Sequence, residues 1–233
     1  LALRIEMTPE QEGLLYIDAP GQPIEMVEIL PSAHRWINNF HLPGRYRFEV
    51  VTEENKETSI ALLFSVFVEQ EIGRPRPLLE RSEVNNPIEA EFWLYQEVNR
   101  IRRTHGIHPL KRFSMFEELT REHSALMADT GVVAHKIRGV TTGVALKAEK
   151  VAHPRARHYE NVAAAQTAKD ALDMVLDSPG HFKVLLCETC THISIGAALE
   201  PNLIGNPRLF VTWEVLEFPE GQPQKIEKLN RDF

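Results

Sequence analysis

The sequence predicts an α+β protein, in which an all-β N-terminal sandwich precedes an α-β-α sandwich domain. Three observations support this prediction. The N-terminal part contains short runs of β-branched and aromatic residues separated by turn signals. From Ile88 onward the apolar residues follow helical spacing, and the final apolar runs return to strand-like composition. Strands first and helices later are typical of α+β proteins or of separate domains.

The domain boundaries follow these changes in pattern. Two domains fit a chain of 233 residues. We divide it into a β-sandwich domain, a linker, an α-β-α domain and a polar tail, at 1–72, 73–87, 88–219 and 220–233. The linker contains Pro75, Pro77 and Pro87, and proline excludes both a long helix and a central strand there.

The N-terminal domain is predicted to contain four strands. They are Leu14–Asp18, Ile24–Leu30, Arg45–Val51 and Ile60–Val68. In the third run, apolar residues alternate with charged ones, which indicates a half-buried strand with Glu49 among its charged positions. Short strands at this spacing favour an antiparallel sandwich.

The second domain is predicted to contain three helices and a short fourth one. Pro87 precedes the first helix and Gly106 follows it, Gly131 ends the second, and Pro179-Gly180 ends the third. The short helix and the two final strands are expected at Phe182–Leu186, His192–Leu199 and Leu209–Phe218.

Composition and charge exclude several classes of protein. With 43% hydrophobic and 25% charged residues, the chain is neither disordered nor collagen-like. No apolar run is long enough for a transmembrane helix. The 26 Lys and Arg against 33 Asp and Glu give a net charge of −7, which disfavours binding to nucleic acid or to an anionic membrane. Because the first residue is Leu1 rather than Met, we expect a processed or truncated product.

Three stretches of the second domain carry a resemblance to a known family. They are 99–128, which contains the run His123-Ser124-Ala125-Leu126-Met127-Ala128; His135 with Tyr159-Glu160-Asn161-Val162-Ala163; and Ser178-Pro179-Gly180-His181 with the apolar runs after it. Through these motifs, about residues 89–218 resemble the CAP superfamily (cysteine-rich secretory proteins, antigen 5 and pathogenesis-related 1, also called SCP domains). The likeness is closest to the bacterial branch.

The resemblance implies an α-β-α sandwich with a cleft built around two histidines and acidic residues, where some members bind a divalent metal. By position, His135 and His181 match the family histidines, and Glu160 matches the acid of the Glu-Asn motif. Asn161 and Ser178 would also lie at the cleft.

Two imidazoles and a carboxylate allow three kinds of site. They can bind Zn²⁺ and leave a position open for water or a ligand, or they can carry out acid–base chemistry near neutral pH. They can also form a buried, hydrogen-bonded cluster with a structural role. Only the resemblance brings His135, Glu160 and His181 together, because their spacing contains no short metal motif.

The neighbouring polar residues favour structural roles. Asn161 precedes an apolar run, and its amide can tie loop carbonyls together. Ser178 precedes Pro179, which is typical of a helix N-cap rather than of a nucleophile.

The two cysteines, Cys187 and Cys190, form a Cys-x-x-Cys motif with three possible uses. It can close a local disulfide in an oxidising compartment, act as a redox pair, or supply half of a zinc site with His192. We expect the disulfide.

The other histidines are interpreted as surface features. The basic run His153–His158 is expected to be a solvated loop or, alternatively, a positive rim that attracts anionic ligands to the cleft. We expect His105, His108 and His123 at the surface or the edge of the core.

Three functions fit these features. The first is a secreted or envelope-exposed (periplasmic or cell-surface) binding module for a metal, small molecule, lipid or protein. The second is a metal-dependent, peptidase-like hydrolase in which His135 and His181 hold Zn²⁺ and Glu160 is the base. The third is a structural or adhesive protein with a vestigial cleft. We favour the first, a protein that is not an enzyme.

Overall fold

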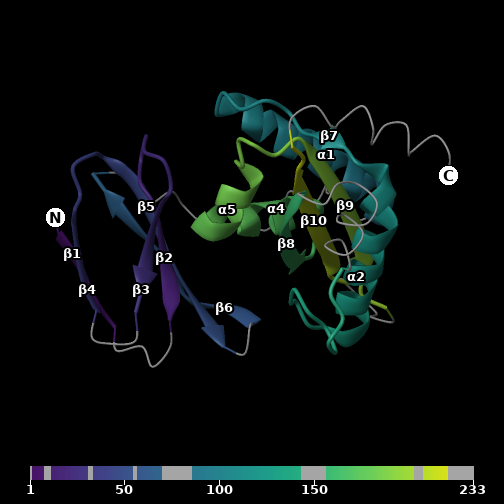
Figure 1. Ribbon diagram of the computed structural model, residues 1–233, viewed down its shortest axis with the longest axis horizontal. Helices are drawn as coiled ribbons and strands as arrows, with labels where there is room; N and C mark the ends of the chain where they lie inside the picture. Colours follow the sequence, from purple (N-terminus) through teal and green to yellow (C-terminus); the bar gives the residue numbers. More distant parts are fainter. Residues whose placement is uncertain are drawn as a thin grey trace. The chain divides into compact units, whose positions relative to one another are not determined.

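A computed structural model of the chain divides it into two compact units, shown in Figure 1. One unit combines Leu1–Leu79 with Leu176–Lys183, and the other combines Glu80–Val175 with Val184–Phe233. The structure describes residues 2–7, 12–30, 34–54, 57–69, 86–142, 156–201 and 207–219. Most of the predicted linker and the whole predicted C-terminal tail lie outside these residues. None of the helices in the described ranges is long and apolar enough to cross a membrane.

The first unit contains two antiparallel sheets. Its strands are β1 (Ala2–Met7), β2 (Gly13–Asp18), β3 (Glu25–Ile29), β4 (His34–Asn39), β5 (Gly44–Glu54) and β6 (Glu57–Val68). One sheet has the order β3-β2-β5-β6, and β1 pairs with β4 in the other. The four predicted strands are present, whereas β1 and β4 were not predicted. The packing of the two sheets into a sandwich stays a prediction.

Strand β5 provides the centre of this unit's core. Tyr46, Phe48 and Val50 are buried, as their alternation predicts, and the ring of Phe48 stacks on Phe64 with 5.0 Å between centroids. The expectation that every charged position of this strand faces solvent is wrong for Glu49, which is 1% exposed. Its carboxylate is covered by residues of the Leu176–Lys183 segment.

The second unit is built on a mixed four-stranded sheet with the order β7-β9-β10-β8. In Figure 1 its two long helices, α1 and α2, lie on one face of this sheet, and α4 lies on the other. Its elements include α1 (Pro87–Thr104), β7 (Lys111–Arg112), the 3-10 helix η1 (Ser114–Phe116), α2 (Glu117–Thr130), β8 (Arg157–Ala165), α4 (Ala168–Asp177), β9 (His192–Leu199) and β10 (Leu209–Glu217). Helix α5 (Pro179–Leu185) belongs in part to each unit.

Strand β8 corrects one expectation. We expected the basic run before Glu160 to be a loop, but Arg157 and His158 are the first residues of this strand. The Glu-Asn motif also lies within β8, which pairs antiparallel with β10 along its whole length. This pairing places Glu160 and Asn161 within a sheet.

The helix ends follow the predicted signals. The Asn86 side chain accepts hydrogen bonds from the backbone amides of Ile88 and Glu89, and Pro87 is the first residue of α1. Helix α2 ends at Gly131, which has a φ of 69°. This left-handed conformation favours glycine, as in many helix C-termini.

Helix α2 packs against β9 with its backbone. A Cβ atom on Gly196 would lie 2.2 Å from the backbone of Thr120 and Arg121, so only glycine fits at this position. Ser124 on the same helix donates to the Gly196 carbonyl at 2.9 Å and contacts the Thr212 hydroxyl at 2.8 Å. These contacts fix α2 over the two central strands.

Candidate functional site

His135 and Glu160, two of the predicted site residues, are in direct contact in the second unit. His135 follows the end of α2, and Glu160 lies in β8. The Nδ1 atom of His135 is 2.8 Å from Oε1 of Glu160, and the two side chains are 42% and 10% exposed. A carboxylate accepts hydrogen bonds, so Nδ1 carries the proton and Nε2 holds the lone pair when the ring is neutral. Glu160 therefore orients a partly exposed imidazole.

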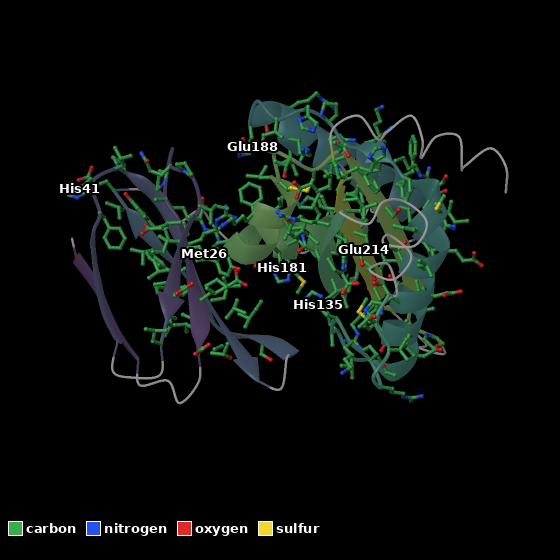
Figure 2. The ribbon with its side chains drawn as sticks, in the orientation of Figure 1. Met26, His41, His135, His181, Glu188 and Glu214 are labelled. Carbon is green, nitrogen blue, oxygen red and sulfur yellow. A yellow bond between two sulfur atoms is a disulfide. The ribbon has the colours of Figure 1, made fainter. Side chains whose placement is uncertain are left out.

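Glu214 on β10 is a further member of this site that the sequence analysis missed (Figure 2). It is fully buried and stands directly opposite Glu160 in the strand register. The hydroxyl of Thr142 donates to its Oε1 at 2.8 Å, and Nδ1 of His158 lies 3.2 Å from its Oε2. We name the group formed by His135, Glu160, Glu214 and His158 the His–Glu chain.

Burial is the largest influence on the pKa of Glu160 in the His–Glu chain. It raises the pKa of Glu160, and the nearby charge of Glu214 acts in the same direction. The hydrogen bond from His135 opposes these effects and lowers the pKa, but the net direction is upward. Glu160 therefore retains its proton to a higher pH than an ordinary glutamate.

His158 forms the other end of the His–Glu chain. The hydrogen bond to Glu214 is the largest influence on it and raises its pKa, and the charges of Glu214 and Glu160 act in the same direction. Burial of the ring lowers the pKa by less. The imidazolium form is thus favoured beside the buried Glu214 carboxylate.

His123 on α2 is buried beside the same group, contrary to the expected surface or core-edge position. It is 3% exposed, and its Nε2 lies 3.0 Å from the carbonyl of Ala134. Because a carbonyl only accepts, Nε2 carries the proton. Its Nδ1 has no hydrogen-bond partner among the described residues. A positive charge on His123 lowers the pKa of Glu160.

The predicted residues Ser178 and His181 belong to the first unit. The backbone amide of His181 donates to Ser178 Oγ at 3.2 Å, so Ser178 is the N-cap of α5, as its position before Pro179 predicts. His181 Nδ1 also lies 2.5 Å from this hydroxyl. Asn161, in contrast, is fully buried in the middle of β8, opposite Trp213. It therefore lies within a strand, and its expected role of tying loop carbonyls together stays a prediction.

The described residues do not assemble a complete metal centre. Among them, no group of three or more His, Cys, Asp or Glu side chains could hold a metal ion. A structural zinc site needs four protein ligands and a catalytic one needs three. His135 fits as one ligand, because its Nε2 is the nitrogen that does not bind Glu160. Any metal there would complete its coordination with water or with groups of a ligand.

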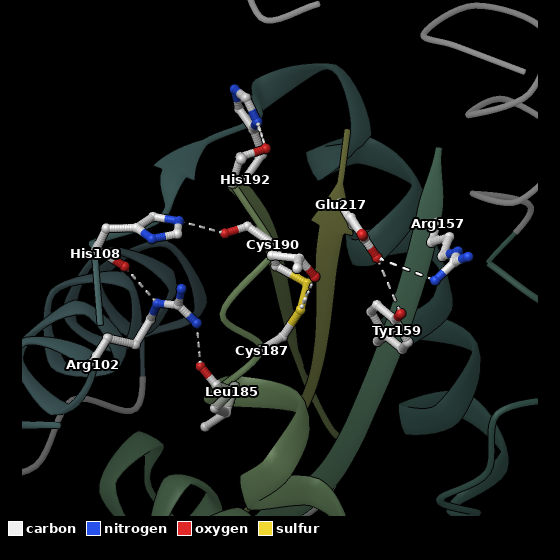
Figure 3. The surroundings of a disulfide bond; sticks show 11 residues. Arg102, His108, Arg157, Tyr159, Leu185, Cys187, Cys190, His192 and Glu217 are labelled. Carbon is white, nitrogen blue, oxygen red and sulfur yellow. Dashed lines mark hydrogen bonds and ion pairs between the residues drawn. A yellow bond between two sulfur atoms is a disulfide. The ribbon is translucent and has the colours of Figure 1, made fainter. Parts of the chain in front are cut away.

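Cys187 and Cys190 form a disulfide in the structure, as the sequence predicts, and so supply neither zinc ligands nor free thiols (Figure 3). The Nε2 of His108 donates to the Cys190 carbonyl at 2.8 Å. The fully buried Arg102 donates to the carbonyls of His108 and Leu185 at 2.9 and 2.6 Å. Burial lowers the pKa of this guanidinium to about 10.

Comparison with protein families matches residues 95–213 to the cysteine-rich secretory protein family (CAP). This range covers slightly more than half of the 233 residues. It includes every residue of the His–Glu chain except Glu214, which directly follows it. Comparison with curated proteins finds no match.

Several solved structures are similar to this chain. An outer surface protein of Borrelia burgdorferi is 19% identical, with a TM-score of 0.44, and the match covers 55% of this chain and 92% of that protein. An extracellular SCP-domain protein of Bacillus anthracis is 17% identical, with a TM-score of 0.47 and coverage of 76% and 66%. A cysteine-rich secretory protein of Staphylococcus aureus is 14% identical, with a TM-score of 0.41 and coverage of 72% and 56%. This chain therefore spans less than two thirds of the latter two structures.

Proposed function

Because this chain belongs to the cysteine-rich secretory protein (CAP) family, we propose that it is an exported binding module rather than an enzyme. Its N-terminal strands would form a sandwich-type spacer or docking domain. The Cys187–Cys190 disulfide supports export, because disulfides persist in oxidising compartments such as the periplasm, the cell surface and the exterior. The compartment would be the envelope or the surrounding medium.

The proposed binding residue is His135, and one observation carries this assignment. The 2.8 Å contact joins a 42% exposed imidazole to a 10% exposed carboxylate. Metal-binding histidines commonly donate their other ring N–H to a carboxylate, which fixes the tautomer and the ring orientation. Nε2 of His135 would therefore be presented with its lone pair outward, ready to bind a divalent cation or a proton donor on a small ligand.

Zn²⁺ is the appropriate first probe, because neutral imidazole is among its preferred ligands. The experiment is a calorimetric titration of Zn²⁺ into the chelator-stripped full chain. Saturable binding that is lost in His135→Ala, and kept in a control with the exposed His41→Ala, would support the proposal. A His181→Ala variant measures separately whether the second family histidine contributes. Binding of equal strength in wild type and His135→Ala would refute the assignment of His135.

A peptidase-like hydrolase is the second candidate, and the raised pKa of Glu160 favours it. A carboxyl with a raised pKa can accept and return a proton closer to neutral pH, which a general base requires. The test is turnover of casein and peptide libraries in the presence of Zn²⁺, with Glu160→Gln as the variant that abolishes it. A wide substrate panel without turnover would count against hydrolysis. If Zn²⁺ and small ligands also failed to bind, the His–Glu chain would have a structural role only, and the cleft would be vestigial.

A further inference from the structure

Glu49 is a buried carboxylate that plays no part in the function proposed above. It lies on β5 in the first unit and is 1% exposed. Its two oxygens are 2.9 and 2.8 Å from Ser178 Oγ, and its Oε2 accepts the backbone amide of Gly180 at 2.6 Å. Its Oε1 is 3.8 Å from Nδ1 of His181. All four residues belong to the same compact unit.

The backbone is shaped to admit this carboxylate. A Cβ atom on Gly180 would lie 2.9 Å from Oε2 of Glu49 and 3.4 Å from the ring of Tyr16. A larger residue here would displace the carboxylate, so glycine permits the close approach. A buried carboxylate is tolerated only when hydrogen bonds satisfy it, and here one hydroxyl and one amide do so.

The position of each proton follows from the chemistry of the Ser178 hydroxyl. This group has one proton to donate and two lone pairs that accept. Its oxygen lies within 2.9 Å of both Glu49 oxygens, which only accept when the carboxylate is ionised, so the hydroxyl proton points to Glu49. The two lone pairs then receive the backbone amide of His181 and its Nδ1. Nδ1 must therefore carry a proton.

We infer that Glu49 is a positioning residue, which acts through Ser178 to hold His181 in the Nδ1-protonated tautomer. In this tautomer Nε2 of the neutral ring carries the lone pair, which is the form that binds a metal or accepts a proton. Residues Ser178 and His181 lie within the range matched by the family model, whereas Glu49 lies far outside it. A strand of the N-terminal part thus prepares a family histidine for its chemistry.

The same contacts exclude a hydrolytic triad of these three residues. In a triad, the histidine bridges the nucleophile and the carboxylate. Here the serine is the bridge, and its proton goes to Glu49 rather than to an imidazole. Ser178 is consequently not activated as a nucleophile.

The test is long-range ¹H–¹⁵N NMR of the full chain with ¹⁵N-labelled histidine, at a pH where the ring is neutral. The His181 signals are assigned by their loss in His181→Gln. We expect the wild type to show a protonated Nδ1 and an unprotonated Nε2. In Ser178→Ala and Glu49→Gln, we expect the Nε2-protonated form to become populated. Glu28→Gln, at an exposed position on strand β3 of the same sheet, should leave the spectrum of His181 unchanged.

The outcomes separate this inference from the proposed function, because the measurement needs neither metal nor substrate. A wild-type His181 protonated on Nε2 would overturn the inference without any variant. Retention of the Nδ1 form in Ser178→Ala would overturn the role of the hydroxyl, and retention in Glu49→Gln would overturn that of the carboxylate. If Glu49→Gln fails to fold, the wild type and Ser178→Ala still decide the result.

Discussion

Glu160 and Glu214 stand directly opposite each other in the register of the antiparallel strands β8 and β10, so their side chains lie on the same face of the sheet. Burial and the charge of Glu214 raise the pKa of Glu160, because a second carboxylate nearby disfavours the ionised form. Each is also held by a histidine, His135 on one side and His158 on the other. The His–Glu chain is therefore a coupled set of titrating groups, and its properties are open to measurement.

The first prediction concerns Glu160 and pH. Because its pKa is raised above the usual 4.5, the folded state binds this proton more tightly than the unfolded state does. That stabilisation is present in full below the unfolded pKa and is lost as the pH rises through the folded one. A neutral amide in Glu160→Gln does not undergo this loss. The free energy of unfolding of the variant, relative to wild type, should therefore increase between pH 4 and pH 7 in urea titrations. A constant or falling difference would contradict the raised pKa.

The second prediction concerns His158, whose pKa is raised mainly by its hydrogen bond to Glu214. Its stabilising contribution is present in full below the unfolded pKa of 6.5 and is lost as the pH rises through the folded pKa. His158→Asn should therefore destabilise the protein more at pH 5.5 than at pH 9, as measured by urea unfolding at both values. An equal loss at the two pH values would mean that the imidazolium does not stabilise the folded state.

Arg102 provides a third prediction. Its removal in Arg102→Ala leaves the carbonyls of His108 and Leu185 without this donor and also opens a cavity. Each unsatisfied buried acceptor costs roughly 1–3 kcal/mol, so we expect a loss of at least about 2 kcal/mol in the free energy of unfolding. Arg100→Ala on the same helix is the matched control, because its ion pair with Glu97 is at the surface. Such pairs contribute about 0–1 kcal/mol. Similar losses in the two variants would refute the structural role of Arg102.

The fourth prediction concerns the disulfide between Cys187 and Cys190. The loop that it closes is very short, so loop-closure entropy gives a stabilisation of only roughly 2 kcal/mol. Reductant should lower the free energy of unfolding of the wild type by about this amount. It should have no effect on Cys187→Ser/Cys190→Ser. Free thiols in unreduced, denatured protein would show that the bond does not form.

The sequence contains enough information for the helices and for half of the site. The ends of α1 and α2 are predictable because Asn86-Pro87 and Gly131 are local signals that act within one turn. The contact of His135 with Glu160 is anticipated only through the family resemblance, since 25 residues separate them. Periodicity alone contains no information on such a long-range pairing.

The local sequence around Glu214 and Glu49 gives no sign of the role of either residue. Glu214 is a single charge within a buried strand, and its role depends on pairing with β8, whose alanine-rich end lacks the usual strand composition. Glu49 fits the polar half of an alternating strand, and its burial comes from Ser178 and Gly180, which lie about 130 residues away in the chain. Tertiary contacts of this kind override the local pattern.

The backbone contact at Gly196 has a consequence for how the second unit folds. A one-residue slip of β9 beneath α2 would place Ile195 or Ala197 where only a hydrogen fits. The helix can thus dock on the sheet in a single alignment. Helix α2 carries His123, and β9 pairs with β10, the strand that carries Glu214. The close contact at Gly196 therefore helps to set the alignment that brings the buried histidine near the two carboxyls. A substitution there would act as a folding defect before it acted on any ligand.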